Sequence, residues 1–95
     1  TADEPVNMPF AAVVSPNGRR IYVSNAGSDD VSVIDLSTNH AVAHLRVGSN
    51  PRGIAISPNG SFVFVNNILD GTLSVIETGV LKISDTVTVT VNTVK

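Results

Sequence analysis

The chain of 95 residues contains no cysteine. Without a thiol it cannot by itself form a disulfide, a zinc–thiolate site, an iron–sulfur cluster or the covalent attachment of a c-type haem. The absence of cysteine leaves the cellular compartment open, because both exported and cytosolic proteins can lack it. No other metal or cofactor motif is present, so the sequence predicts no cofactor within these residues.

Charge and long apolar runs are also scarce. Charged residues make up 15% of the chain, the net charge is -2, and the six basic residues are scattered. This argues against nucleic-acid binding, which usually needs a basic surface. The longest continuous apolar stretch runs from Phe10 to Val14, far short of the ~20 residues that a membrane helix needs. A chain of this length and composition predicts one small globular domain without a membrane span.

Catalytic constellations are missing as well. No Ser/His/Asp or Cys/His combination can be argued, and no glycine-rich loop leads from a strand into a helix. His40 and His44 have a spacing that would bring them together on a helix, but on a strand they lie ~13 Å apart. We therefore expect a solvated outer strand there and no metal site. Catalytic residues are predicted to be absent, and whether the intact protein is an enzyme stays open.

The chain does contain an internal repeat. Ser15-Pro16-Asn17-Gly18 returns 42 residues later as Ser57-Pro58-Asn59-Gly60, and residues 9–50 and 51–92 are identical at 12 of 42 positions. A fixed period of this length indicates a repeat architecture. The organisation is then a lead-in (1–8), a first blade repeat (9–50), a second blade repeat (51–92) and a tail (93–95).

The repeat has an all-β pattern. Val, Ile and Thr are dense, no stretch is helical, and turn-forming residues recur every 8–12 positions. The expected strands are Phe10–Ser15, Arg19–Asn25, Val31–Leu36, Ala41–Val47, Gly53–Ser57, Ser61–Asn67, Thr72–Glu77 and Lys82–Val89. Four short antiparallel strands in ~42 residues are the unit of a β-propeller blade. The alternative is a plain eight-stranded β-sandwich, which does not require an internal repeat.

Two blades do not close a propeller, because four to eight are needed. Each blade has two apolar faces, and one interface between two blades leaves half of these faces uncovered. We therefore expect a fragment of a larger propeller, with seven as the expected number of blades, that is unstable as an isolated monomer. Its expected partners are the remaining blades or other protein subunits, in a homo-oligomer or a larger complex.

Several motifs resemble the repeat of the YVTN family of β-propellers. Ile21-Tyr22-Val23-Ser24-Asn25 and Val31-Ser32-Val33-Ile34-Asp35 follow its consensus, while the second copy departs from it at Phe64–Asn67 and Glu77. The resemblance implies an exported protein of bacteria or archaea, located in the periplasm, outside the cell or at its surface. The stretch Asn66–Ile76 is similar to one in propeller domains joined to c-type cytochrome peroxidase-like domains. Only the propeller part of such a protein could be present here.

Alternate connections between antiparallel strands lie on the same rim of the sheet. The loops Ala26–Asp30, Gly48–Arg52 and Ile68–Gly71 are therefore expected to share one rim, and the two Ser-Pro-Asn-Gly turns the other. In propellers the first strand of each blade lines the central channel, and ligands commonly bind at the rim beside it. The polar residues placed there are the candidate ligand-binding set: Arg52, Asn25, Asn67, Asp29, Asp30 and Asp70.

Each candidate also has a purely structural interpretation. Asn25 and Asn67 occupy the same repeat position, so we expect them to make local hydrogen bonds to the backbone. The three aspartates are expected to be solvated loop residues, since a metal site needs converging oxygens that two blades cannot show. Arg52 stands where the first blade has Phe10, so it is not part of the repeat. It is the best functional candidate.

Three functions follow as hypotheses. The first is a non-catalytic binding or scaffold module, part of a YVTN-like propeller in an exported bacterial or archaeal protein. The second is the propeller portion of a periplasmic redox enzyme similar to c-type haem peroxidases, with its chemistry outside this chain. The third is a surface-layer or adhesion protein. A Cys-x-x-Cys-His motif after Lys95 would favour the second, and many further repeats with a membrane anchor the third.

Overall fold

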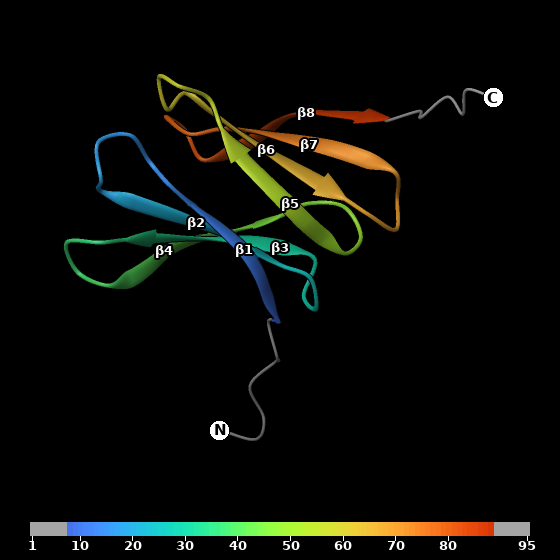
Figure 1. The fold of residues 1–95 in the computed structure, drawn as a ribbon, viewed down its shortest axis with the longest axis horizontal. Coiled ribbons are helices and arrows are strands. Elements are labelled where there is room, and N and C mark those ends of the chain that lie inside the picture. Colours follow the sequence, from blue (N-terminus) through green and yellow to red (C-terminus); the bar gives the residue numbers. More distant parts are fainter. Residues whose placement is uncertain (1–7, 89–95) are drawn as a thin grey trace.

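The protein forms two antiparallel four-stranded sheets in the computed structural model, which describes residues 8–88 (Figure 1). Within this range there is no helix, and hence none that could cross a membrane. Blade 1, in strand order, consists of β1 (Pro9–Val14), β2 (Arg20–Asn25), β3 (Asp30–Asp35) and β4 (His40–Arg46). Blade 2 consists of β5 (Pro51–Ile56), β6 (Phe62–Asn67), β7 (Thr72–Glu77) and β8 (Lys82–Thr88).

The predicted strands are confirmed with shifts of one or two residues at their ends. Val89, the predicted tail and the lead-in other than Met8 lie outside the described residues. The first strands of the two blades, β1 and β5, are in contact with each other, and β2 also contacts β5. In Figure 1, β4 and β8 lie at opposite sides of the molecule, with β1 and β5 between them. Such convergence of first strands is the arrangement of neighbouring propeller blades.

The Ser-Pro-Asn-Gly turns explain the first hairpin of each blade. The Asn17 side-chain oxygen accepts hydrogen bonds from the Ser15 hydroxyl (2.7 Å) and the Arg19 backbone N–H (2.9 Å). Gly18 then takes a positive φ of 73°, a conformation that costs other residues energy. The second turn repeats these contacts through Asn59, and Gly60 has a φ of 78°. The hydrogen bonds of the asparagine and the positive φ of the glycine therefore explain why the Ser-Pro-Asn-Gly motif recurs in both blades.

Other tight turns recur with the same period. Besides the two glycines of these turns, positive φ values occur at three pairs separated by 42 residues: Met8 and Asn50, Asp29 and Gly71, and Asn39 and Leu81. The residue types differ within each pair although the backbone conformation is the same. The path of the chain is thus more strictly repeated than its sequence.

The core lies between the blades and uses different faces of each. We call face A the side that carries Tyr22, Val31 and Val33 in blade 1, and face B the side that carries Val63, Val65 and Ile76 in blade 2. These six side chains form one buried cluster, each 2% exposed or less. None is the repeat equivalent of another. Face A of blade 1 therefore packs against face B of blade 2, a heterologous contact that can be continued in both directions.

The two remaining faces are partly open. Face A of blade 2 carries Phe64, Leu73 and Val75, the equivalents of the buried residues of blade 1, and all three are half-buried. Face B of blade 1 carries Ile21, Val23 and Ile34, which are also half-buried. The same repeat positions are thus fully buried on the face that meets the other blade and only half-buried on the outer face.

Candidate functional site

The three loops predicted to share a rim do meet. The Val47 N–H donates to the Asp29 carbonyl (3.0 Å), which joins the end of β4 to the loop after β2. The Ile68 N–H donates to the Asn50 carbonyl (3.1 Å), and the Leu69 N–H donates to the Ser49 carbonyl (3.2 Å). The connection between the blades is therefore held from both sides by backbone hydrogen bonds.

Asp29 and Asp70 take part in the same junction. The Asp29 carboxylate accepts from the Asn50 N–H (2.9 Å), and the Asp70 carboxylate accepts from the Ser49 N–H (2.8 Å). A carboxylate that accepts a backbone N–H is a comparatively strong partner because the bond is charge-assisted. Asp70 is exposed as predicted and Asp29 is half-buried, but neither is merely a solvated loop residue, because both fix the connection between the blades. Asp30 is half-buried at the start of β3 rather than in the loop.

Asn25 and Asn67 serve the repeat, but not through backbone groups as predicted. The Asn25 amide donates to the Ser32 hydroxyl (2.8 Å) and the Asp30 carboxylate (2.9 Å). The Asn67 amide donates to the Ser74 hydroxyl (2.9 Å) and the Thr72 hydroxyl (3.1 Å). The correction has a simple cause, because the strand ladder occupies the nearby backbone groups. Each asparagine instead reaches side chains on the same face of the next strand.

Asn67 is buried at least as completely as Asn25, its equivalent in blade 1. It is fully buried, and its side-chain oxygen has no hydrogen-bond partner among the described residues. A Cβ atom at Gly48 would come within 2.8 Å of the Asn67 side chain and 2.5 Å of an Asp70 carboxylate oxygen. Gly48 therefore permits the inter-blade loop to pass directly over Asn67.

Arg52 lies exposed on β5, the first strand of blade 2. Its Nε donates to the Asn50 side-chain oxygen (2.6 Å), and its guanidinium lies 5.2 Å from the centroid of the Phe10 ring. Phe10 is the repeat equivalent of Arg52 on β1, so the two non-matching residues stack on each other. Such cation–π contacts at exposed sites contribute roughly 0.5–1 kcal/mol. Of the six candidates, Arg52 is the exposed cation whose position suits an anionic ligand.

The histidines are not brought together as a metal site. His44 on β4 lies with Nδ1 3.1 Å from the Ser32 hydroxyl and 3.9 Å from the Asp30 carboxylate, so it extends the polar chain that begins at Asn25. His40 lies exposed at the other end of the same strand. Residues 8–88 contain no group of three or more His, Cys, Asp or Glu side chains arranged to hold a metal ion.

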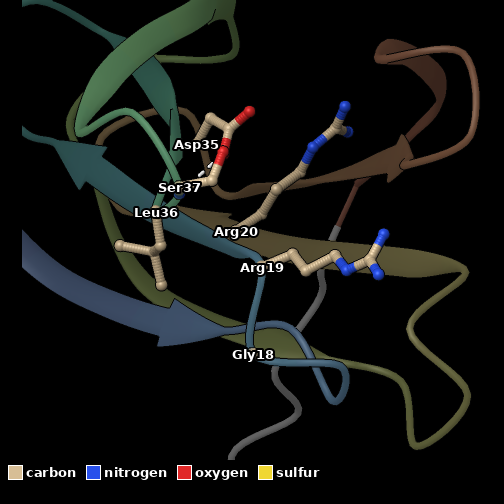
Figure 2. A pocket seen from close by; sticks show the side chains of 6 residues that line it. All are labelled: Gly18, Arg19, Arg20, Asp35, Leu36 and Ser37. Carbon is tan, nitrogen blue, oxygen red and sulfur yellow. Dashed lines mark hydrogen bonds between the residues drawn. The ribbon is translucent and has the colours of Figure 1, made fainter.

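The opposite rim has a basic feature that the sequence analysis missed. A hollow of about 600 Å³ is lined by Gly18, Arg19, Arg20, Asp35, Leu36 and Ser37, and Figure 2 shows both arginine side chains extending the same way from the start of β2. The equivalent positions in blade 2 are Ser61 and Phe62. The sequence contained a signal for Arg19 and Arg20, because they are charged residues without charged equivalents in the other blade, which is the criterion that selected Arg52.

Asp35 in this hollow is already engaged. Its carboxylate accepts from the Ser37 hydroxyl (2.7 Å) and from the Ser37 backbone N–H (2.8 Å). These two bonds, with smaller contributions from the nearby arginines, hold the pKa of Asp35 below its ordinary value of 3.8. The carboxylate therefore stabilises the turn after β3 in its charged form.

Comparison with known proteins supports the fold. A family model described as the cytochrome D1 heme domain matches residues 6–95. The structure of hydrazine synthase from Kuenenia stuttgartiensis is similar with a TM-score of 0.85 and 25% identity, over 88% of this chain and 24% of that chain. The structure of the dihydro-heme d1 dehydrogenase NirN in complex with DHE has a TM-score of 0.76 and 30% identity, over 83% and 17%.

A curated relative extends the comparison to another kind of protein. The PE-PGRS family protein PE_PGRS18 of Mycobacterium tuberculosis (strain ATCC 25618 / H37Rv) is 45% identical over 49 residues, which are 52% of this chain and 10% of that protein. The chain thus spans a quarter or less of each of these three proteins. The two structural similarities confirm the predicted all-β fold with two propeller blades.

Proposed function

For this chain, which belongs to the cytochrome D1 heme domain family, we propose that its two blades are a non-catalytic binding and scaffold part of a larger, YVTN-like β-propeller. The protein that contains them would be exported by a bacterium or an archaeon, as the resemblance to YVTN repeats implies. Other blades or protein subunits are then its immediate partners. Arg52, at the channel side of β5, is its best-placed group for an anionic ligand.

The main support for this proposal is that face A of blade 2 is partly open. Tyr22, Val31 and Val33 are covered by blade 2, whereas their equivalents Phe64, Leu73 and Val75 have no such cover. Burying an aliphatic or aromatic side chain stabilises by roughly 1.5–3 kcal/mol. Phe64, Leu73 and Val75 are already half-buried, so completing their burial would gain about half of that for each, a few kcal/mol in all. This is still a substantial part of the ~5–15 kcal/mol that stabilises a domain. A further blade would cover them with the same A-to-B contact.

Sedimentation of residues 1–95 at micromolar concentration tests the scaffold role. We expect self-association or incomplete folding of the wild-type chain, because its outer faces can pair with those of copies. Leu73→Asn, on the open face A, should reduce the self-association. Val80→Asn is the matched control, since Val80 is exposed in the turn between β7 and β8. A monodisperse, cooperatively folding wild-type monomer would contradict the proposal.

A second candidate is the propeller portion of a periplasmic haem-related protein, supported by the family match and the similarity to NirN. Few of the described side chains could bind a haem iron. Haem iron takes His, Cys, Met or Tyr as axial ligands, but both histidines lie on the outer strand β4 and Tyr22 is buried between the blades. Met8 is exposed, with its sulfur beside Gly27.

Among residues 8–88, Met8 is thus the one potential axial ligand that lies exposed away from β4, and the rest of a haem site would depend on residues elsewhere. The absorption spectrum of the purified intact protein, with a pyridine haemochrome assay, separates the two candidates. A stoichiometric haem signal, with a haem-attachment or axial-ligand motif outside these residues, would favour the second candidate. A protein that folds fully and contains no haem after expression under haem-replete conditions would favour the first.

A further inference from the structure

The two Ser-Pro-Asn-Gly turns lie against each other and enclose a polar hollow. A Cβ atom at Gly60 would come within 3.1 Å of the Pro16 ring, so the turns are in van der Waals contact. The hollow beside them has a volume of about 380 Å³. Its lining comes from both blades: Ser15, Pro16, Asn17, Arg19, Arg20, Tyr22, Asn59, Gly60 and Thr78. No carboxylate is among these residues.

The two asparagines in the lining have fixed orientations. The side-chain oxygen of Asn17 is held by the Ser15 hydroxyl and the Arg19 N–H, and that of Asn59 by the Ser57 hydroxyl and the Ser61 N–H. Each amide therefore turns its oxygen toward its own turn and has both Nδ2 hydrogens left for other partners. The repeat thus supplies two donor groups to one hollow.

The two arginines add charge that the repeat does not require. A hollow of about 490 Å³ in blade 2, lined by Asn59 to Phe62 and Glu77 to Gly79, lies at the positions equivalent to the hollow of Figure 2 but has no basic residue in its lining. The depression itself is therefore a property of the fold, while Arg19 and Arg20 are particular to blade 1. Asp35 faces the neighbouring hollow, where Ser37 already holds its carboxylate.

We propose that the inter-turn hollow binds an oxyanion, either the phosphate or the carboxylate group of a small soluble ligand. Two guanidinium groups provide forked donors that match such oxygens, and the two Nδ2 groups, one from each turn, add neutral donors. The site lies on the rim opposite to the inter-blade loop and Arg52. It does not depend on the proposed scaffold function.

Titration calorimetry of the intact protein tests this proposal with inorganic phosphate and with succinate, each at constant ionic strength. We expect saturable binding of at least one ion with one site per chain, and the tighter of the two identifies the chemical class. The double variant Arg19→Gln/Arg20→Gln should weaken that binding by about tenfold or more, since it removes two charge-assisted donors. Arg46→Gln, on β4, is a control that removes one positive charge away from the hollow, and it should bind like the wild type.

Asn17→Asp is the second variant, because it preserves the turn's oxygen acceptor and replaces the donor by a negative charge. It should weaken binding at least as much as the double arginine variant while the melting curve of the protein stays close to that of the wild type. Three results would overturn the proposal: no saturable binding of either ion, wild-type affinity in both site variants, or an equal loss in the Arg46→Gln control.

Discussion

Gly48→Ala tests whether the inter-blade loop is packed as closely as the structure indicates. The added methyl would lie 2.8 Å from the Cγ and Nδ2 atoms of Asn67 and 2.5 Å from a carboxylate oxygen of Asp70. Asn67 is fully buried and cannot swing into solvent. Either its side chain or the loop must move. The bonds that the Asn67 amide donates to Ser74 and Thr72, and the bond that the Ser49 N–H donates to the Asp70 carboxylate, are then weakened or lost.

The expected cost follows from these contacts. A typical internal hydrogen bond contributes ~0.5–1.5 kcal/mol, and forcing a methyl group into a packed site costs ~1–3 kcal/mol. Loss of one or two bonds together with overpacking gives a destabilisation of about 2–5 kcal/mol in the free energy of unfolding. Urea denaturation of the protein, followed by circular dichroism, measures this difference between variant and wild type.

Gly79→Ala is the matched control. Gly79 has no heavy atom within 4 Å of an added Cβ and no positive φ, so the substitution should be neutral or stabilise by roughly 0.4–1 kcal/mol. Asn67→Ala adds a second check, because it removes the atoms that the new methyl would meet. The cost of Gly48→Ala should shrink in that background. Equal effects of Gly48→Ala and Gly79→Ala would refute the reasoning.

Three further predictions concern the turns and the faces. Ser37→Ala removes the first cause of the low Asp35 pKa, so NMR titration should show this pKa rising toward 3.8; because the folded pKa is lowered, the contribution of this carboxylate to stability is present above pH ~4 and is lost as the pH falls through the folded pKa. In the isolated chain, Val31→Ala should lower the free energy of unfolding more than Leu73→Ala does. In the intact protein, similar losses for the two variants would show that a further blade covers Leu73. A loss for Leu73→Ala that stays small in the intact protein would count against such a blade. Gly60→Ala should destabilise by roughly 1–2 kcal/mol because of its positive φ, and an unaffected urea midpoint would show that the turn adopts another conformation.

Local chemistry explains why the elements were predictable from the sequence. Pro16 and Gly18 define a turn through their own backbone preferences, and the β-branched runs on either side define strands. Both depend on neighbours within a few residues. The repeat adds a second, independent copy of each signal, so the strand β7 was predicted at its observed bounds, Thr72–Glu77, and the others were displaced by only one or two residues.

The candidate site was less predictable. Arg52 was selected because it breaks the repeat; it stacks on Phe10, its equivalent in blade 1, and its role in binding stays a prediction. Asn25 and Asn67 were recognised as structural, but their partners depend on which side chains the strand register places on the same face. The aspartates were assigned to solvent because nothing in the local sequence indicates that a loop 21 residues away offers its backbone N–H groups.

By itself, the sequence determined that this chain forms two four-stranded blades joined by recurrent turns, because those features follow from short-range backbone and hydrophobic preferences. Tertiary structure alone decided which faces meet. Tyr22 and Phe64 are equivalent in sequence, yet one is 2% exposed and the other half-buried. It also decided that Asn17 and Asn59, with 42 residues between them, line the same hollow. Both outcomes depend on the stacking of one blade on the next, which is a long-range contact that no local pattern encodes.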